Sequence, residues 1–164
     1  MTATPSQTIG PFFYNGMEWG FEASKGLTTA VVLTGRVLDG AGVAINDAMV
    51  EAWVPAAAEE TQSGTPGYRR STSTHGDNLS YRLELPVAPQ PGEPAAYITV
   101  FARGLLKHQF TAVYLGDPGK AALLDQVPAA RRATLIAERD AATGAWRWDI
   151  HMQGERETAF FEYR

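Results

Sequence analysis

The chain of 164 residues is long enough for one domain with a sizeable core, and 45% of its residues are hydrophobic. Its formal net charge is -4 and its lysines and arginines form no basic cluster, which argues against a nucleic-acid partner. It has no cysteine, no export-signal pattern and no run of about 18 apolar residues, so we expect a cytoplasmic protein without disulfides or a membrane span.

The first segment, residues 1–30, is predicted to be an extended arm. Residues 2–25 place aromatic side chains among Gly, Ser and Pro without a sustained period. This composition favours a segment that packs on another surface, and a neighbouring subunit is the expected surface. The alternative is a strap over its own domain.

Residues 31–164 alternate short strand patterns with turn chemistry. The clearest pattern alternates Trp146, Trp148, Ile150 and Met152 with polar residues, so one side of that strand should pack. The sequence therefore predicts an all-β fold, a single-domain β-sandwich with short helical insertions. Strands are predicted at 31–39, 48–54, 81–85, 96–104, 107–115, 146–153 and 158–163, helical segments at 119–127 and 128–134, and surface loops at 55–78 and 86–94.

Arg103 stands in a run that has no other charge, residues 95–106. Removing a guanidinium from water costs several kcal/mol unless an anion compensates it, so we expect an anion beside this side chain. An internal carboxylate such as Glu51 or Asp149 would supply that anion, and so would a bound substrate.

The sequence offers no familiar metal or nucleophile motif. His75, His108 and His151 fall in one loop and two different strands, without a spacing that puts two imidazoles on one metal. Ser6 and Thr8 lack the glycines of a nucleophile elbow. We therefore expect the histidines to be structural or solvent-facing, and hydrolase and nucleotide-binding functions are disfavoured.

Three segments resemble the intradiol ring-cleaving dioxygenases: residues 4–13 (TPSQTIGPFF), 101–108 (FARGLLKH) and 147–161 (RWDIHMQGERETAFF). Their order and spacing add specificity, as do residues 35–42 and 48–53. The closest resemblance is to the alpha chains of members built from two chains. It implies a homologous beta subunit, which forms an alpha/beta protomer within a larger oligomer.

The resemblance also implies that the beta subunit, not this chain, holds the cofactor. There, two tyrosinates and two histidines bind Fe(III), and O2 attacks a bound catechol carboxylate. In this chain Ala95 and Tyr97 take the two histidine positions, and the loop 86–94 has no tyrosine. We therefore expect no metal ligand and no catalytic residue in this chain alone.

Substrate-binding residues follow from the same resemblance. Arg103, Thr8 and Gly10 match family positions that line the active site at the alpha/beta interface. A guanidinium, a hydroxyl and a backbone amide can all donate hydrogen bonds to an anionic substrate. The chain is shorter than typical members near 59–67 and 75–94, so the edges of the pocket and the preferred catechol carboxylate stay open.

Two other hypotheses compete with this interpretation. A non-enzymatic β-sandwich binding module, transthyretin-like or carbohydrate-binding, explains the fold equally well but gives no reason for the arm sequence or for Arg103. A self-sufficient metalloenzyme would use scattered tyrosines and histidines. The iron content of the isolated chain separates these alternatives.

Overall fold

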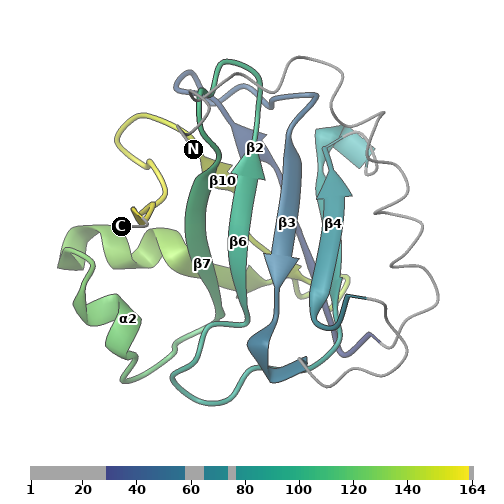
Figure 1. Ribbon diagram of the computed structural model, residues 1–164, viewed down its shortest axis with the longest axis vertical. Helices are drawn as coiled ribbons and strands as arrows, with labels where there is room; N and C mark the ends of the chain where they lie inside the picture. Colours follow the sequence, from purple (N-terminus) through teal and green to yellow (C-terminus); the bar gives the residue numbers. More distant parts are fainter. Residues whose placement is uncertain (1–28, 58–64, 74–76, 163–164) are drawn as a thin grey trace, which may run out of the picture.

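The computed structural model describes residues 29–57, 65–73 and 77–162. Strands dominate these residues (Figure 1), and the few helical segments are short. None of the helices in the described ranges is long and apolar enough to cross a membrane. The strands are β1 (Val31–Gly35), β2 (Val37–Leu38), β3 (Met49–Trp53), β4 (Tyr68–Thr72), β5 (Tyr81–Leu85), β6 (Ala96–Phe101), β7 (Gln109–Leu115), β8 (Ile136–Arg139), β9 (Trp146–Arg147) and β10 (Ile150–His151); the helical segments are α2 (Ala122–Asp125) and the 3₁₀ helices η2 (Pro55–Ala57), η3 (Asp77–Leu79) and η4 (Ala129–Leu135).

Eight strands form one sheet in the order β4-β3-β6-β7-β8-β9-β1-β5, and β10 pairs with β2. In Figure 1, β7, β6, β3 and β4 make a front layer, with β2 and β10 behind it. The two ends of the sheet meet, because the backbone amide of Arg82 in β5 donates to Ser71 Oγ in β4 at 2.9 Å. The sheet is thus nearly closed around one core.

The core is built from alternating side chains of the two layers. Leu33, Val50, Leu83, Ile98 and Ile150 are each at most 1% exposed. Burying each such side chain stabilises the fold by about 1.5–3 kcal/mol. The prediction of an all-β sandwich-like domain is confirmed.

Several predicted elements match the structure closely. Residues 81–85 form β5 exactly, 48–54 contain β3, and 107–115 contain β7. Both predicted helical segments form, and Pro128 stands directly before η4. In residues 146–153 the apolar side chains are more buried than the polar ones, as predicted. The segment is not one continuous strand, however, because it divides into β9 and β10.

Other boundaries were wrong. The predicted loop 55–78 contains β4, the predicted strand 96–104 ends at Phe101, and β8 was not predicted. Residues 158–163 do not form a regular strand where described; Phe161 makes a single bridge to Phe110. The predicted arm, 1–30, falls almost wholly on residues 1–28, outside the described residues, so it stays a prediction.

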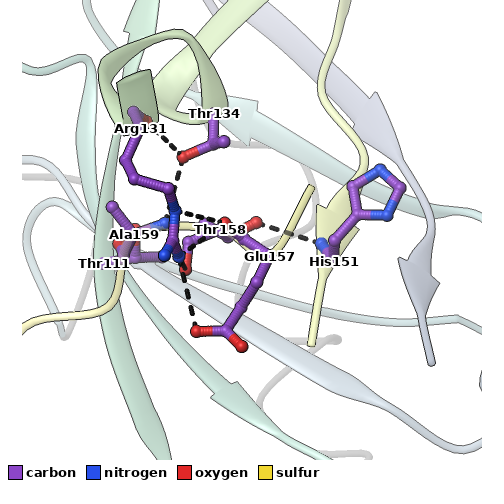
Figure 2. A network of polar contacts seen from close by, with 7 residues as sticks. All are labelled: Thr111, Arg131, Thr134, His151, Glu157, Thr158 and Ala159. Atoms are coloured by element: carbon purple, nitrogen blue, oxygen red, sulfur yellow. Dashed lines mark hydrogen bonds and ion pairs between the residues drawn. The ribbon is translucent and has the colours of Figure 1, made fainter. Parts of the chain in front are cut away.

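Polar contacts rather than strand pairing hold the segment after β10. The guanidinium of Arg131, in η4, donates to the Glu157 carbonyl at 2.7 and 3.0 Å and to the Thr158 carbonyl at 3.2 Å (Figure 2). The Arg131 side chain also forms an ion pair with the Glu157 carboxylate at 3.3 Å. One arginine therefore anchors two consecutive peptide units.

Threonine hydroxyls complete this anchor. Thr134 Oγ1 accepts from the Ala159 amide at 3.0 Å, and Thr111 Oγ1 donates to the Ala159 carbonyl at 2.8 Å. Thr158 Oγ1 accepts from the His151 amide at 3.0 Å. The backbone at Thr158 and Ala159 thus keeps buried hydrogen bonds without belonging to the sheet.

Candidate functional site

Arg103 lies in the turn that follows β6. Gly104 has a positive φ of 84°, and the Leu105 amide donates to the Ala102 carbonyl at 3.3 Å, so the chain reverses here instead of extending the strand. Met49 at the start of β3 pairs with Phe101 at the end of β6. The turn therefore lies beside the residues that precede β3.

Two of those residues hold the Arg103 side chain. Arg103 Nε donates to Asp47 Oδ2 at 2.8 Å, and Arg103 Nη2 donates to Asn46 Oδ1 at 2.6 Å. The anion expected beside this arginine is thus Asp47, neither Glu51 nor Asp149. Glu51 instead pairs with Arg70, and Asp149 contacts two other arginines.

The Arg103–Asp47 pair is asymmetric in its burial. The Arg103 side chain is 59% exposed, whereas that of Asp47 is only 5% exposed. The expectation that the guanidinium lies inside a core strand was wrong, because the turn carries it to the surface. The pair instead fixes an exposed cation to a buried carboxylate, an arrangement able to receive an anionic ligand from outside this chain.

The described residues do not fit an iron site of their own. At the positions matched to the family's histidines, Ala95 is buried and Tyr97 is exposed, with its ring centroid 6.2 Å from that of Trp53. In the described ranges, no group of three or more His, Asp or Glu side chains could hold a metal. The positions matched to the family's histidines therefore carry a methyl group and a phenol.

The tyrosine hydroxyls point to the same conclusion. Burial raises the pKa of Tyr114 to about 12, and burial also raises the pKa values of Tyr68 and Tyr81. The Tyr81 hydroxyl donates to the Trp148 carbonyl at 2.6 Å, and the Tyr68 hydroxyl donates to Glu51. The Tyr68 and Tyr81 hydroxyls are thus engaged as donors within this chain, and the Tyr114 hydroxyl is buried without a hydrogen-bond partner among the described residues.

The two histidines in the described ranges give no sign of a reactive role. His108 is exposed, with its ring centroid 5.4 Å from Phe101 and 4.4 Å from Phe110, and burial lowers the pKa of His151. His75, Thr8 and Gly10 lie outside the described residues. Of the predicted substrate-binding residues, the structure therefore places only Arg103.

The described residues line cavities that were not predicted from the sequence. One of about 750 Å³ is lined by Arg36, Arg82, Arg147 and Asp149 among others. Each of these three guanidiniums has a carboxylate partner at 3.1–3.3 Å, and Arg36 and Arg147 share Asp149. Sequence reasoning missed it because its lining comes from segments more than 100 residues apart.

The second cavity, of about 450 Å³, has an aromatic lining that includes Tyr97, Phe110 and Phe161. It lies against β6 and β7, beside one of the positions matched to the family's histidines. Its lining residues fall in three predicted strands and one predicted helical segment, so the sequence did not mark them as one site.

Comparison with known proteins gives a consistent result. No protein-family model matches the chain. The chain is 36% identical to a protein named protocatechuate 3,4-dioxygenase alpha chain from Burkholderia cepacia, over 97% of this chain and 96% of that protein. It is 31% identical to the protein of the same name from Pseudomonas putida, over 98% and 96% of the two chains.

A solved structure agrees on the fold. Catechol 1,2-dioxygenase from Pseudomonas arvilla C-1 superposes with a TM-score of 0.50 at 20% identity, covering 80% of this chain and 54% of that one. At this identity the likeness concerns the fold alone.

Proposed function

The chain belongs to the family of protocatechuate 3,4-dioxygenase alpha chains, and from this we propose that it is the alpha subunit of such an enzyme. The reaction is intradiol cleavage: O2 opens the ring of protocatechuate (3,4-dihydroxybenzoate) between its two hydroxyl-bearing carbons. The product is 3-carboxy-cis,cis-muconate, an intermediate of aromatic catabolism through the beta-ketoadipate pathway. The names of two relatives matched over nearly their full length favour this function over a non-enzymatic binding module.

We propose that the Fe(III) of this reaction is held by a homologous beta subunit. The support comes from Ala95 and Tyr97 at the histidine positions and from tyrosine hydroxyls that donate within this chain. The alpha and beta chains would form a protomer within a larger oligomer. We also propose a cytoplasmic location, in keeping with a chain that has no cysteine.

The observation that carries the proposal is the exposed side chain of Arg103. Asn46 and Asp47 hold this side chain in the turn that follows β6. Protocatechuate has a carboxylate and two hydroxyls that lose protons, so a fixed cation favours its anionic forms. We propose that Arg103, with Thr8 and Gly10, binds this substrate at the interface with the beta chain.

The proposal is tested by purifying the chain alone, the beta chain alone and the two chains after co-expression. Iron content, visible absorption and O2 consumption with protocatechuate are measured for each. We expect an iron-free isolated chain and a coloured, active complex. Stoichiometric iron in the isolated alpha chain would contradict the proposal that the beta chain holds the iron. A co-purified complex that does not cleave protocatechuate would contradict the proposed function.

A further inference from the structure

Two contacts of the Arg103 side chain involve the same edge of its guanidinium. Nε and Nη2 form the side edge of the planar group, and these two atoms donate to Asp47 and Asn46. The adjoining end edge carries Nη1 and the second Nη2 hydrogen. With its side edge fixed, the guanidinium keeps its plane and its direction, and 59% of the side chain is exposed.

Asp47 is well suited to act as this anchor. It stands two residues before β3, in the turn beside the end of β6, so its backbone lies close to the first residues of the sheet. Its side chain is only 5% exposed, and its Oδ1 is buried without a hydrogen-bond partner among the described residues. Its hydrogen bond from Arg103 is therefore the main compensation that these residues show for the buried charge.

An arginine side chain loses considerable rotamer freedom when it binds a ligand in one geometry. If internal contacts restrict the side chain beforehand, that loss is not incurred on binding, and the donor groups are already in position. A surface arginine without such contacts would give a weaker and less directed interaction.

We propose that Asp47, assisted by Asn46, is a positioning residue that directs the guanidinium of Arg103 toward the carboxylate of the bound aromatic substrate. This inference rests on the proposed function and deepens it, because it assigns a role to residues that do not themselves reach the substrate. Under this inference, the ion pair between Arg103 and Asp47 orients a substrate-binding group and does not only stabilise the turn.

The test compares variants in the assembled two-chain complex, with KM and kcat measured for protocatechuate and for catechol, which lacks the carboxylate. For Asp47→Ala we expect KM for protocatechuate to rise about tenfold with a smaller change in kcat, since a misdirected donor weakens substrate orientation. Asp47→Asn keeps an oxygen acceptor without the charge, so its KM should lie between Asp47→Ala and wild type. Parameters for catechol should stay near those of wild type.

Two further variants complete the design. Arg103→Gln should raise KM for protocatechuate at least as much as Asp47→Ala. Glu84→Gln weakens an ion pair in which both side chains are exposed, Arg82–Glu84 at 3.1 Å, and should leave KM unchanged. Iron content and complex assembly are measured for every variant.

The outcomes separate the two claims. If Arg103→Gln raises KM while Asp47→Ala and Asp47→Asn do not, the positioning role is overturned and the proposed function stands. If the Asp47 variants weaken turnover of catechol as much as that of protocatechuate, the residue is only structural and the inference also fails. A wild-type complex that does not cleave protocatechuate removes the proposed function, and the inference with it.

Discussion

Tyr81 and Gly35 show how single residues lock the two layers together. The Tyr81 hydroxyl is fully buried and donates to the Trp148 carbonyl at 2.6 Å. Gly35 lies against the same carbonyl, and a Cβ built on it would come within 1.8 Å of the Trp148 oxygen. The backbone of β1 can therefore approach the β9–β10 junction only because residue 35 has no side chain.

Gly35→Ala should thus lower the free energy of unfolding by about 3 kcal/mol or more, because backbone atoms must move apart. Urea unfolding measures this change. Gly42→Ala is the matched control: Gly42 has a φ of 78° but a Cβ there meets nothing within 4 Å. Its cost should be only about 1–2 kcal/mol of conformational strain, and an equal cost at both positions would refute the packing argument.

Asp149 gives a prediction about pH. Burial would raise its pKa, but the backbone amide of Arg36 at 2.9 Å, the Arg36 guanidinium at 3.2 Å and the charge of Arg147 outweigh burial and hold the pKa below its usual value. A carboxyl with a lowered pKa in the folded state stabilises the fold above its unfolded pKa of about 3.9, and this contribution is lost as pH falls further.

The difference in unfolding free energy between wild type and Asp149→Asn should therefore shrink as pH falls below about 4. Urea unfolding between pH 3 and 7 measures it. Asp125→Asn is the control, because Asp125 lies 3.8 Å from Arg132 and its side chain is 80% exposed. Its unfolding free energy should differ little from that of wild type at any pH. A difference for Asp149→Asn that is independent of pH would contradict the assignment.

Among the strands, β4 shows why periodicity alone fails. Its inward-facing Arg69 and Ser71 are polar yet buried, and the Arg69 guanidinium donates to the Glu84 carbonyl at 3.0 Å. A strand whose core-facing positions are polar has no apolar alternation, so its sequence has the composition of a loop. The pattern in β5 is detectable because Tyr81, Leu83 and Leu85 are apolar and buried.

The segment after β10 depends on side chains for its position, which gives another prediction. Thr134→Val removes the acceptor of the Ala159 amide and the donor to the Arg131 carbonyl at 2.7 Å (Figure 2). We expect a loss of about 1–2 kcal/mol in stability and faster hydrogen exchange at the Ala159 amide. Thr143→Val, in an exposed turn, is the control and should change neither; unaltered exchange in Thr134→Val would show that the network does not hold this segment.

Across the whole molecule, the sequence predicted the class of fold and singled out Arg103, but it did not predict the surroundings of this residue. Arg103 was expected in a strand because Ala102, Leu105 and Leu106 are apolar, yet Leu106 is among the exposed hydrophobic residues of the turn. Asp47 was not considered as its partner, because the sequence does not reveal that the pairing of β3 with β6 brings the turn before β3 beside Arg103. Thr8 and Gly10 stay predictions from the resemblance alone.

The central claim is that this chain supplies a directed cation to a reaction centre whose iron belongs to another polypeptide. A crystal structure of the alpha/beta complex with protocatechuate bound tests it most directly. The account predicts the Arg103 guanidinium within about 2.7–3.2 Å of a substrate oxygen, with Asp47 still holding its Nε and the iron bound by the beta chain. An Arg103 paired with Asp47 but remote from the substrate and the iron would contradict the account.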